Sequence, residues 1–103
     1  MINDSPRAWE VTYSIKASKQ RDKMPKKIQD AVDALVMEME KEGPWRKNWP
    51  NFSLLNSKGL PKDTFHCHLK KGRPTYVSCW WVMDKKQKTI EVIYVGTHEN
   101  APY

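Results

Sequence analysis

The stretch TFHCHLKKGRPTYVSCWWVMDKKQKTIEVIYV, from Thr64 to Val95, decides the fold. It contains three runs rich in β-branched and aromatic residues, Thr64–Lys70, Thr75–Asp84 and Thr89–Val95. Runs of this composition are typical of strands. Their separators are short, a Lys-Gly pair and the segment DKKQK. We therefore expect the three strands to pair as an antiparallel meander.

The residues before this stretch predict one strand and two helices. Trp9–Ile15 is β-branched and aromatic, and the polar segment 17–24 favours a short helix. Pro25 suits the first turn of a second helix, and Gly43-Pro44 is a stop signal. Between them, apolar residues recur at helical spacing, at Ile28, Val32, Leu35 and Met39.

The element order predicts an α+β fold, β-α-α-β-β-β, with a helical hairpin on one face of a small antiparallel sheet. Residues 44–63 contain three prolines and are expected to form a long irregular connection. A chain of 103 residues is long enough for one core, so we expect a single domain over residues 1–103.

Composition favours a soluble, cytoplasmic protein without a membrane partner. The start, MINDSPRAWE, has no apolar h-region, and no apolar run approaches the roughly 20 residues that span a bilayer. The two cysteines, Cys67 and Cys79, lie within strand-like runs. They are interpreted as reduced core thiols, and a zinc-ligand role for Cys67 is the alternative.

The net charge of +6 is unevenly distributed. Residues 1–27 hold seven basic and three acidic side chains. Residues 28–42 hold one basic and five acidic side chains, and residues 43–103 hold ten basic and four acidic ones. A basic surface of this kind favours a polyanion or an acidic protein as partner. Ordinary solubility charge is the alternative explanation.

Strand alternation separates two sets of side chains in FHCHL. Phe65, Cys67 and Leu69 share an apolar face, whereas His66 and His68 share the other face, roughly 6–7 Å apart. The two imidazoles are therefore expected to be neighbours that point away from the core.

Three interpretations of these histidines compete. A metal site with His98 as third ligand lacks an obvious carboxylate or second cysteine, so we predict neither metal nor cofactor. The histidines can also be ordinary polar residues on an exposed strand face. Phosphate chemistry is the third interpretation, because histidine transfers protons near neutral pH and the cations Lys70, Lys71 and Arg73 follow at once.

Two further groups are candidates. The ending YVGTHENAPY carries His98, Glu99 and Tyr103, which matter only if the end of the last strand lies near the preceding strands. The segment GPWRKNWP interleaves two tryptophans with Arg46 and Lys47, a pattern that suits base stacking and phosphate contact. Burial of those tryptophans over the core is the favoured alternative.

With these elements in order, FHCHLKKGRPTYVSCWWVMDKK and IEVIYVGTHENAPY resemble the RelE/ParE superfamily of bacterial toxins, most closely the RelE and HigB side. In topology the resemblance covers nearly the whole chain, and in motifs it covers residues 64–103. RelE-type toxins keep lysines where this chain has His66 and His68. These toxins also have an RNA-contacting arginine on the next strand. The nearest counterpart in this chain is Arg73, which lies in a turn.

The resemblance implies a microbial RNase-like fold and a metal-independent endoribonuclease, an mRNA interferase that blocks translation on the ribosome. It also implies a cognate antitoxin in a heteromeric complex. His98 falls where relatives place Arg or His, and Tyr103 where a terminal Tyr often stacks on a base. The implied acid–base set is His98 and His66, supported by His68 or Glu99. A ParE-type gyrase inhibitor and a non-catalytic RNA-binding module remain alternatives.

Overall fold

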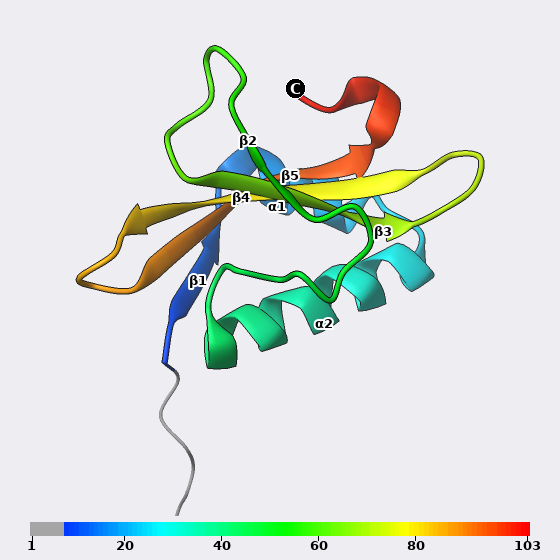
Figure 1. Cartoon of the computed structure of the whole chain (residues 1–103). Coiled ribbons are helices and arrows are strands. Elements are labelled where there is room, and N and C mark those ends of the chain that lie inside the picture. Colours follow the sequence, from blue (N-terminus) through cyan, green and yellow to red (C-terminus); the bar gives the residue numbers. More distant parts are fainter. Residues whose placement is uncertain (1–7) are drawn as a thin grey trace, which may run out of the picture.

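The strand and helix patterns fold into two helices on one face of a five-stranded sheet in the computed structural model, which describes residues 8–103 (Figure 1). In chain order the elements are β1 (Glu10–Tyr13), α1 (Ile15–Asp22), α2 (Lys26–Glu42), β2 (Ser53–Leu55), β3 (Thr64–Lys70), β4 (Tyr76–Asp84), β5 (Thr89–Thr97) and a 3₁₀ turn (His98–Asn100). The expectation that no secretory signal is present falls largely on residues 1–7, which lie outside the described residues.

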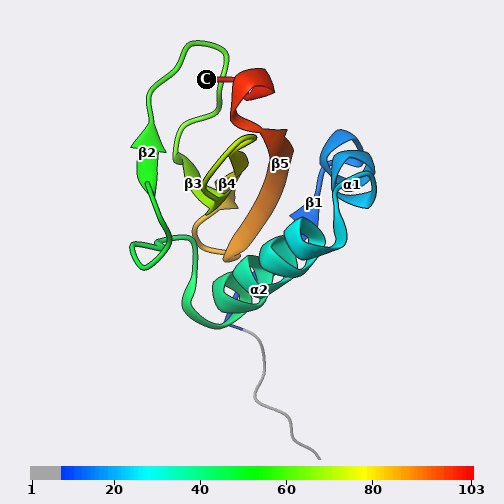
Figure 2. The same ribbon diagram turned by 90° about the vertical axis from the view of Figure 1, so that its right-hand side faces the viewer.

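The sheet order is β1-β5-β4-β3-β2. Strands β3, β4 and β5 form the antiparallel meander that the turn signals predict, and β2 adds an antiparallel pair with β3 that was not predicted. The α+β class and the helical hairpin on one face are confirmed (Figure 2). The expectation of a purely antiparallel sheet is wrong for β1, which runs parallel to β5 with Glu10 opposite Thr89. The chain between β1 and β5 contains both helices and three strands, so the long connection that parallel strands need is available.

The first strand is shorter than predicted because a helix begins within its expected range. Ser14 is the N-cap of α1, and its Oγ accepts a hydrogen bond from the Ala17 N–H at 3.0 Å. This contact satisfies one free amide of the first helical turn. Ile15, expected in the strand, is therefore the first residue of α1 and is exposed.

The connection expected to be irregular contains a short edge strand. β2 pairs with the start of β3, placing Ser53 opposite His66 and Leu55 opposite Thr64. The residues around β2 remain without regular structure, as predicted. The strand matters for function because it lies beside the first of the two β3 histidines.

The core forms between the apolar stripe of α2 and one sheet face. The four predicted stripe residues are all buried, from Ile28 to Met39. Trp80 of β4 is fully buried against them, and its Nε1 donates to the Pro44 carbonyl at 3.0 Å. Trp81 faces the opposite way and donates its Nε1 proton to Glu91 Oε1 at 2.9 Å. The two tryptophans thus anchor opposite faces, as alternation predicts.

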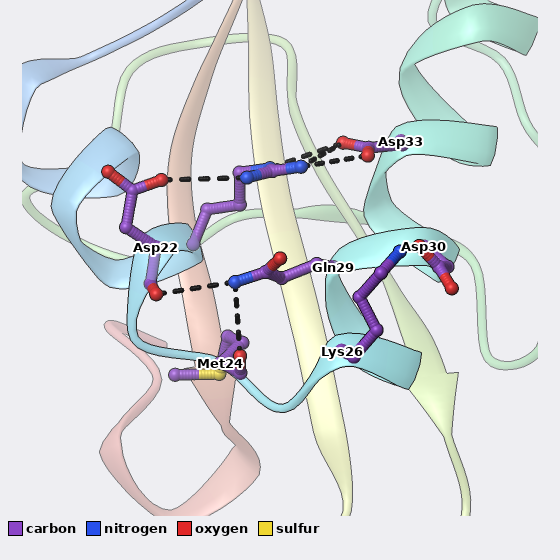
Figure 3. A network of polar contacts seen from close by, with 7 residues as sticks. Asp22, Met24, Lys26, Gln29, Asp30 and Asp33 are labelled. Atoms are coloured by element: carbon purple, nitrogen blue, oxygen red, sulfur yellow. Dashed lines mark hydrogen bonds and ion pairs between the residues drawn. The ribbon is translucent and has the colours of Figure 1, made fainter.

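Polar contacts fasten the helical hairpin (Figure 3). The Arg21 guanidinium of α1 binds both carboxylate oxygens of Asp33 in α2, with Nη2–O distances of 2.8 and 3.0 Å. Gln29 Nε2 donates to the carbonyls of Asp22 and Met24, each at 3.2 Å. These bonds fix the angle between α1 and α2, so the hairpin packs on the sheet as one unit.

A smaller apolar cluster covers the sheet face away from the helices. Val77, Cys79 and Tyr94 are buried there, and Tyr103 packs against them. Cys67 is buried on the helix side, and both thiols are free, which confirms their interpretation as core thiols. The C-terminal end of the chain lies beside the loop after β2 on this second face (Figures 1 and 2).

Candidate functional site

Strand β3 presents two histidines on the face away from the helices. Phe65 and Cys67 point into the core, so the alternate residues His66 and His68 point outward. Their ring centroids are 6.0 Å apart. His66 is 8% exposed, and its Nδ1 lies 3.1 Å from the Oγ of Ser53 on β2. The edge strand therefore covers and orients His66 and leaves His68 more accessible.

The C-terminal segment adds two rings to the same place. After β5 ends, His98 lies with its ring centroid 5.6 Å from that of His68. The Tyr103 ring lies 4.6 Å from His66 and 5.8 Å from His98. The four side chains His66, His68, His98 and Tyr103 form a contiguous group, which we call the histidine cluster. Strand β4 lies between β5 and β3, so the segment after β5 crosses β4 to reach the β3 histidines.

The cluster opens on a hollow of about 580 Å³ between the β3–β4 turn and the end of β5. Its lining combines two imidazoles, one guanidinium, one carboxylate and two hydroxyls, and consists of His68, Gly72, Arg73, Pro74, Thr75, Thr97, His98 and Glu99. Lys70 and Lys71 are exposed beside it, at the start of the same turn. The site therefore combines proton-transfer groups with cations, as phosphate chemistry requires.

Burial and neighbouring charges favour neutral imidazoles on β3. Burial lowers the pKa of His66 below its ordinary value, and His68 and His98 lower it further against an opposing hydrogen bond to Ser53. Burial also lowers the pKa of His68, with contributions from His98 and Lys71. Both rings thus hold their protons weakly at neutral pH, which suits acceptance of a proton from substrate.

The lowered pKa values predict that acid destabilises the fold. Unfolding restores the ordinary histidine pKa of about 6.5, so below that pH the unfolded chain binds more protons. The free energy of unfolding should therefore fall from pH 7 to pH 5.5, by at most about 1.4 kcal/mol per pH unit for each histidine. Denaturant titrations at each pH measure the slope.

The variant His66→Asn tests the assignment of this slope, since it removes one titrating ring while keeping a polar group opposite Ser53. Its slope should be shallower than that of the unmodified protein. An equal slope in both proteins would show that His66 does not contribute.

Tyr103 is turned inward. Its hydroxyl is buried without a hydrogen-bond partner among the described residues, and burial raises the pKa of Tyr103 to about 12. Its ring covers His66 instead of facing the hollow. Tyr103 must therefore turn outward before it can stack on a nucleotide base.

The structure does not bring Arg46 to the histidine cluster. Arg46 is buried, and its Nη1 lies 3.1 Å from Oε1 of Glu38 in α2. Burial alone would raise the pKa of Glu38, but hydrogen bonds from Asn48, Trp49 and Arg46 lower it below its ordinary value. The Arg46 guanidinium thus braces the loop after α2, so we leave Arg46 and the nearby exposed Lys47 out of the site.

The aromatic part of that loop is divided between core and surface. Trp49 packs against the core, whereas Trp45 is 54% exposed and meets Phe52 and Phe65 edge-on. The favoured alternative, burial over the core, therefore holds for Trp49 and only partly for Trp45.

Sequence reasoning missed three polar residues of the site. Ser53 holds His66 from a strand that carries no strand signal, and Thr75 and Thr97 line the hollow as ordinary strand-end threonines. Within residues 8–103, no group of three or more His, Cys, Asp or Glu side chains is arranged to hold a metal ion. No helix in the same range is long and apolar enough to cross a membrane.

Comparisons with known proteins give structural neighbours only. No family model and no curated protein sequence matches the chain. A mutant of the E. coli toxin RelE in the free state superposes with a TM-score of 0.66 at 20% identity, over 91% of this chain and 87% of that one.

Two further neighbours belong to the same group of structures. The YoeB dimer from Staphylococcus aureus gives a TM-score of 0.66 at 14% identity, over 87% of this chain and 97% of YoeB. The intact E. coli RelBE toxin–antitoxin complex gives 0.60 at 19% identity, over 86% and 95%. Together with the helical hairpin on the mixed sheet, these superpositions show that the chain has the fold of RelE-like toxins.

Proposed function

We propose that the protein is the toxin of a toxin–antitoxin pair and cleaves messenger RNA on the ribosome, which blocks translation. The observation that carries this proposal is the histidine cluster, in which His68 and His98 face a hollow that Arg73 also lines, with Lys70 and Lys71 exposed just before it in the chain. Imidazoles beside cations suit phosphodiester cleavage, whereas a surface that only binds nucleic acid needs no proton-transfer group. The likeness of the fold to RelE and YoeB supports the choice of RNA as substrate.

The proposed reaction is attack of a ribose 2′-oxygen on the adjacent phosphorus. The 2′-OH gives its proton to a neutral imidazole as the new O–P bond forms. The bond from phosphorus to the 5′-oxygen breaks, and a second, protonated imidazole gives that oxygen its proton. The products are a 2′,3′-cyclic phosphate and a free 5′-OH, and side chains alone carry out every proton transfer.

The geometry suggests a division of roles. His68 is the accessible base, because burial keeps it neutral and it lines the hollow. His98, one ring away, supplies the proton to the leaving oxygen, and Glu99 lies at its side. This proposal exchanges the expected roles of His66 and His68, because His66 is buried under Tyr103 and does not line the hollow. The cations that bind phosphates and stabilise the charge of the transition state are Lys70, Lys71 and Arg73.

The proposed partners follow from charge and from the same neighbours. A chain of net charge +6 suits the RNA and ribosome surfaces as well as an acidic antitoxin. The RelBE neighbour is a toxin–antitoxin complex, which supports a cognate antitoxin for this chain. We propose that the antitoxin lays an acidic or amphipathic segment over the basic surface.

A translating extract tests this function directly. Addition of the purified protein should produce new messenger RNA ends within the translated frame, mapped by primer extension. The new downstream fragments should carry a 5′-OH, so that a kinase labels them without prior phosphatase treatment. Cleavage should weaken strongly when initiation is blocked, because the ribosome orients the RNA. Intact messenger RNA together with stalled DNA supercoiling would reject the proposal in favour of gyrase inhibition.

A further inference from the structure

The peptide group that precedes His98 is held from both sides. The Tyr94 hydroxyl donates to the Thr97 carbonyl oxygen at 2.6 Å. The His98 N–H donates to the Thr75 carbonyl oxygen at 2.9 Å. The Thr97 carbonyl and the His98 N–H belong to one planar unit, so two bonds in opposite directions fix its orientation. That orientation determines where the 3₁₀ turn begins and where the His98 side chain points.

Tyr94 reaches this peptide because Gly96 leaves room for it. Tyr94 and Gly96 lie two positions apart on β5 and share a sheet face. A Cβ atom on Gly96 would lie 2.7 Å from the Tyr94 hydroxyl oxygen and 3.0 Å from Cζ of the ring. Contacts that short are not tolerated, so any side chain at position 96 would displace the ring. Because Gly96 has no side chain, the Tyr94 ring can lie along the strand and its hydroxyl can reach the Thr97 carbonyl oxygen.

The surroundings keep Tyr94 in one place and in one protonation state. Its ring is 6% exposed and packs with Val77 and Cys79 under Tyr103. Burial raises the pKa of Tyr94, against the opposing effect of its bond to Thr97, so the hydroxyl remains a donor across the neutral range. A space-filling role alone would not require the Tyr94 hydroxyl to form a hydrogen bond with the peptide group that precedes His98.

We propose that Tyr94 is a positioning residue for His98, acting through the Thr97–His98 peptide, with Gly96 as the residue that makes its reach possible. The catalytic consequence rests on the proposed ribonuclease function, whereas the positioning itself does not. Loss of the hydroxyl frees one side of the peptide and lets the 3₁₀ turn rotate. His98 then samples orientations in which it does not face the hollow, and the cluster loses its shape.

The variant Tyr94→Phe removes the hydroxyl and keeps the ring. Hydrogen exchange of the His98 amide should accelerate by about 10-fold, since one net hydrogen bond is lost from the turn. The NMR chemical shifts of the His98 ring protons should also change, because the ring moves relative to that of His68. In the ribosome-dependent assay, kcat should fall by about 10-fold with KM within about two-fold, because binding groups remain in place. Unchanged exchange at the His98 amide together with unchanged ring chemical shifts would overturn the proposal.

Tyr76→Phe is the matched control. Tyr76 also lies in the sheet near Thr97 but packs toward the helices, and no hydrogen bond of its hydroxyl is seen in residues 8–103. This variant should match the unmodified protein in both NMR measurements and in cleavage. Equal changes in Tyr76→Phe and Tyr94→Phe would show a general loosening of the sheet and reject a specific role for Tyr94.

The variant Gly96→Ala tests the same contact from the other side. In the unmodified background it should displace the Tyr94 ring and reproduce the faster exchange at His98. In a Tyr94→Leu background the clash is gone, so the added methyl group should change little more. Equal effects in both backgrounds would overturn the part of the proposal that concerns Gly96. If the unmodified protein cuts no RNA, the proposed function fails, yet these NMR measurements still decide the role of Tyr94.

Discussion

The variant His98→Ala should cut messenger RNA at least about 100-fold more slowly than the unmodified protein, because one acid–base group is worth roughly 10²–10⁴ in rate. His98 is exposed and its ring lies at the end of β5, outside both apolar clusters. The substitution should therefore leave the free energy of unfolding nearly unchanged. Rates from the translating extract, measured at matched folded concentration, test the expectation.

Glu99→Gln is the matched control for that result. Glu99 is the neighbouring residue of the same 3₁₀ turn and also lines the hollow, but it is assigned only a supporting role. Its substitution should lower the rate less than His98→Ala does. Unchanged cutting by His98→Ala would remove His98 from the mechanism, and a larger effect at Glu99 would reverse the assignment.

The largest expected effect on stability is that of Trp80→Ala, a loss of about 3–5 kcal/mol in the free energy of unfolding. Trp80 has no exposed surface, and its ring lies 6.1 Å from Phe52 and 6.3 Å from Phe65 between their centroids. The substitution also leaves the Pro44 carbonyl without its donor. Since domains are typically stable by 5–15 kcal/mol, the variant should be partly unfolded at moderate temperature.

Trp45→Ala is the comparison for this prediction. Trp45 is an equally large side chain of the same aromatic group, but it is 54% exposed. Its removal should cost less than about 2 kcal/mol, because exposed area gains little from burial. Urea titrations of both variants give the difference. Equal losses would show that Trp80 is not the centre of the core.

Local pattern was sufficient for the elements that bury one face. Strand β3 runs from Thr64 to Lys70 as predicted, because alternation of apolar and polar residues marks both its ends and its faces. The same alternation placed His66 and His68 side by side. Helix α2 ends before Gly43, as its stop signal indicates. In each case the deciding information lies within a few residues.

The pairing of strands that are distant in the chain could not be predicted from local sequence patterns. β2 has three residues in a proline-containing loop and exists only because β3 offers it an edge. The parallel register of β1 depends on a partner almost 80 positions later in the chain. The bond from Tyr94 to Thr97 has no sequence signal, since an aromatic strand residue normally indicates packing alone. These features follow from tertiary geometry, which single-sequence patterns do not carry.

The position of β5 has a consequence for the cell that makes the protein. β5 lies between β1 and β4, so the N-terminal strand has no neighbour until the final part of the chain has been synthesised. His98 and Tyr103 come later still. A nascent chain in which residues 89–103 are still within the exit tunnel therefore has an open sheet and only two of the four cluster rings, His66 and His68. On the proposed function, cleavage of messenger RNA therefore cannot begin before residues 98–103 have left the exit tunnel.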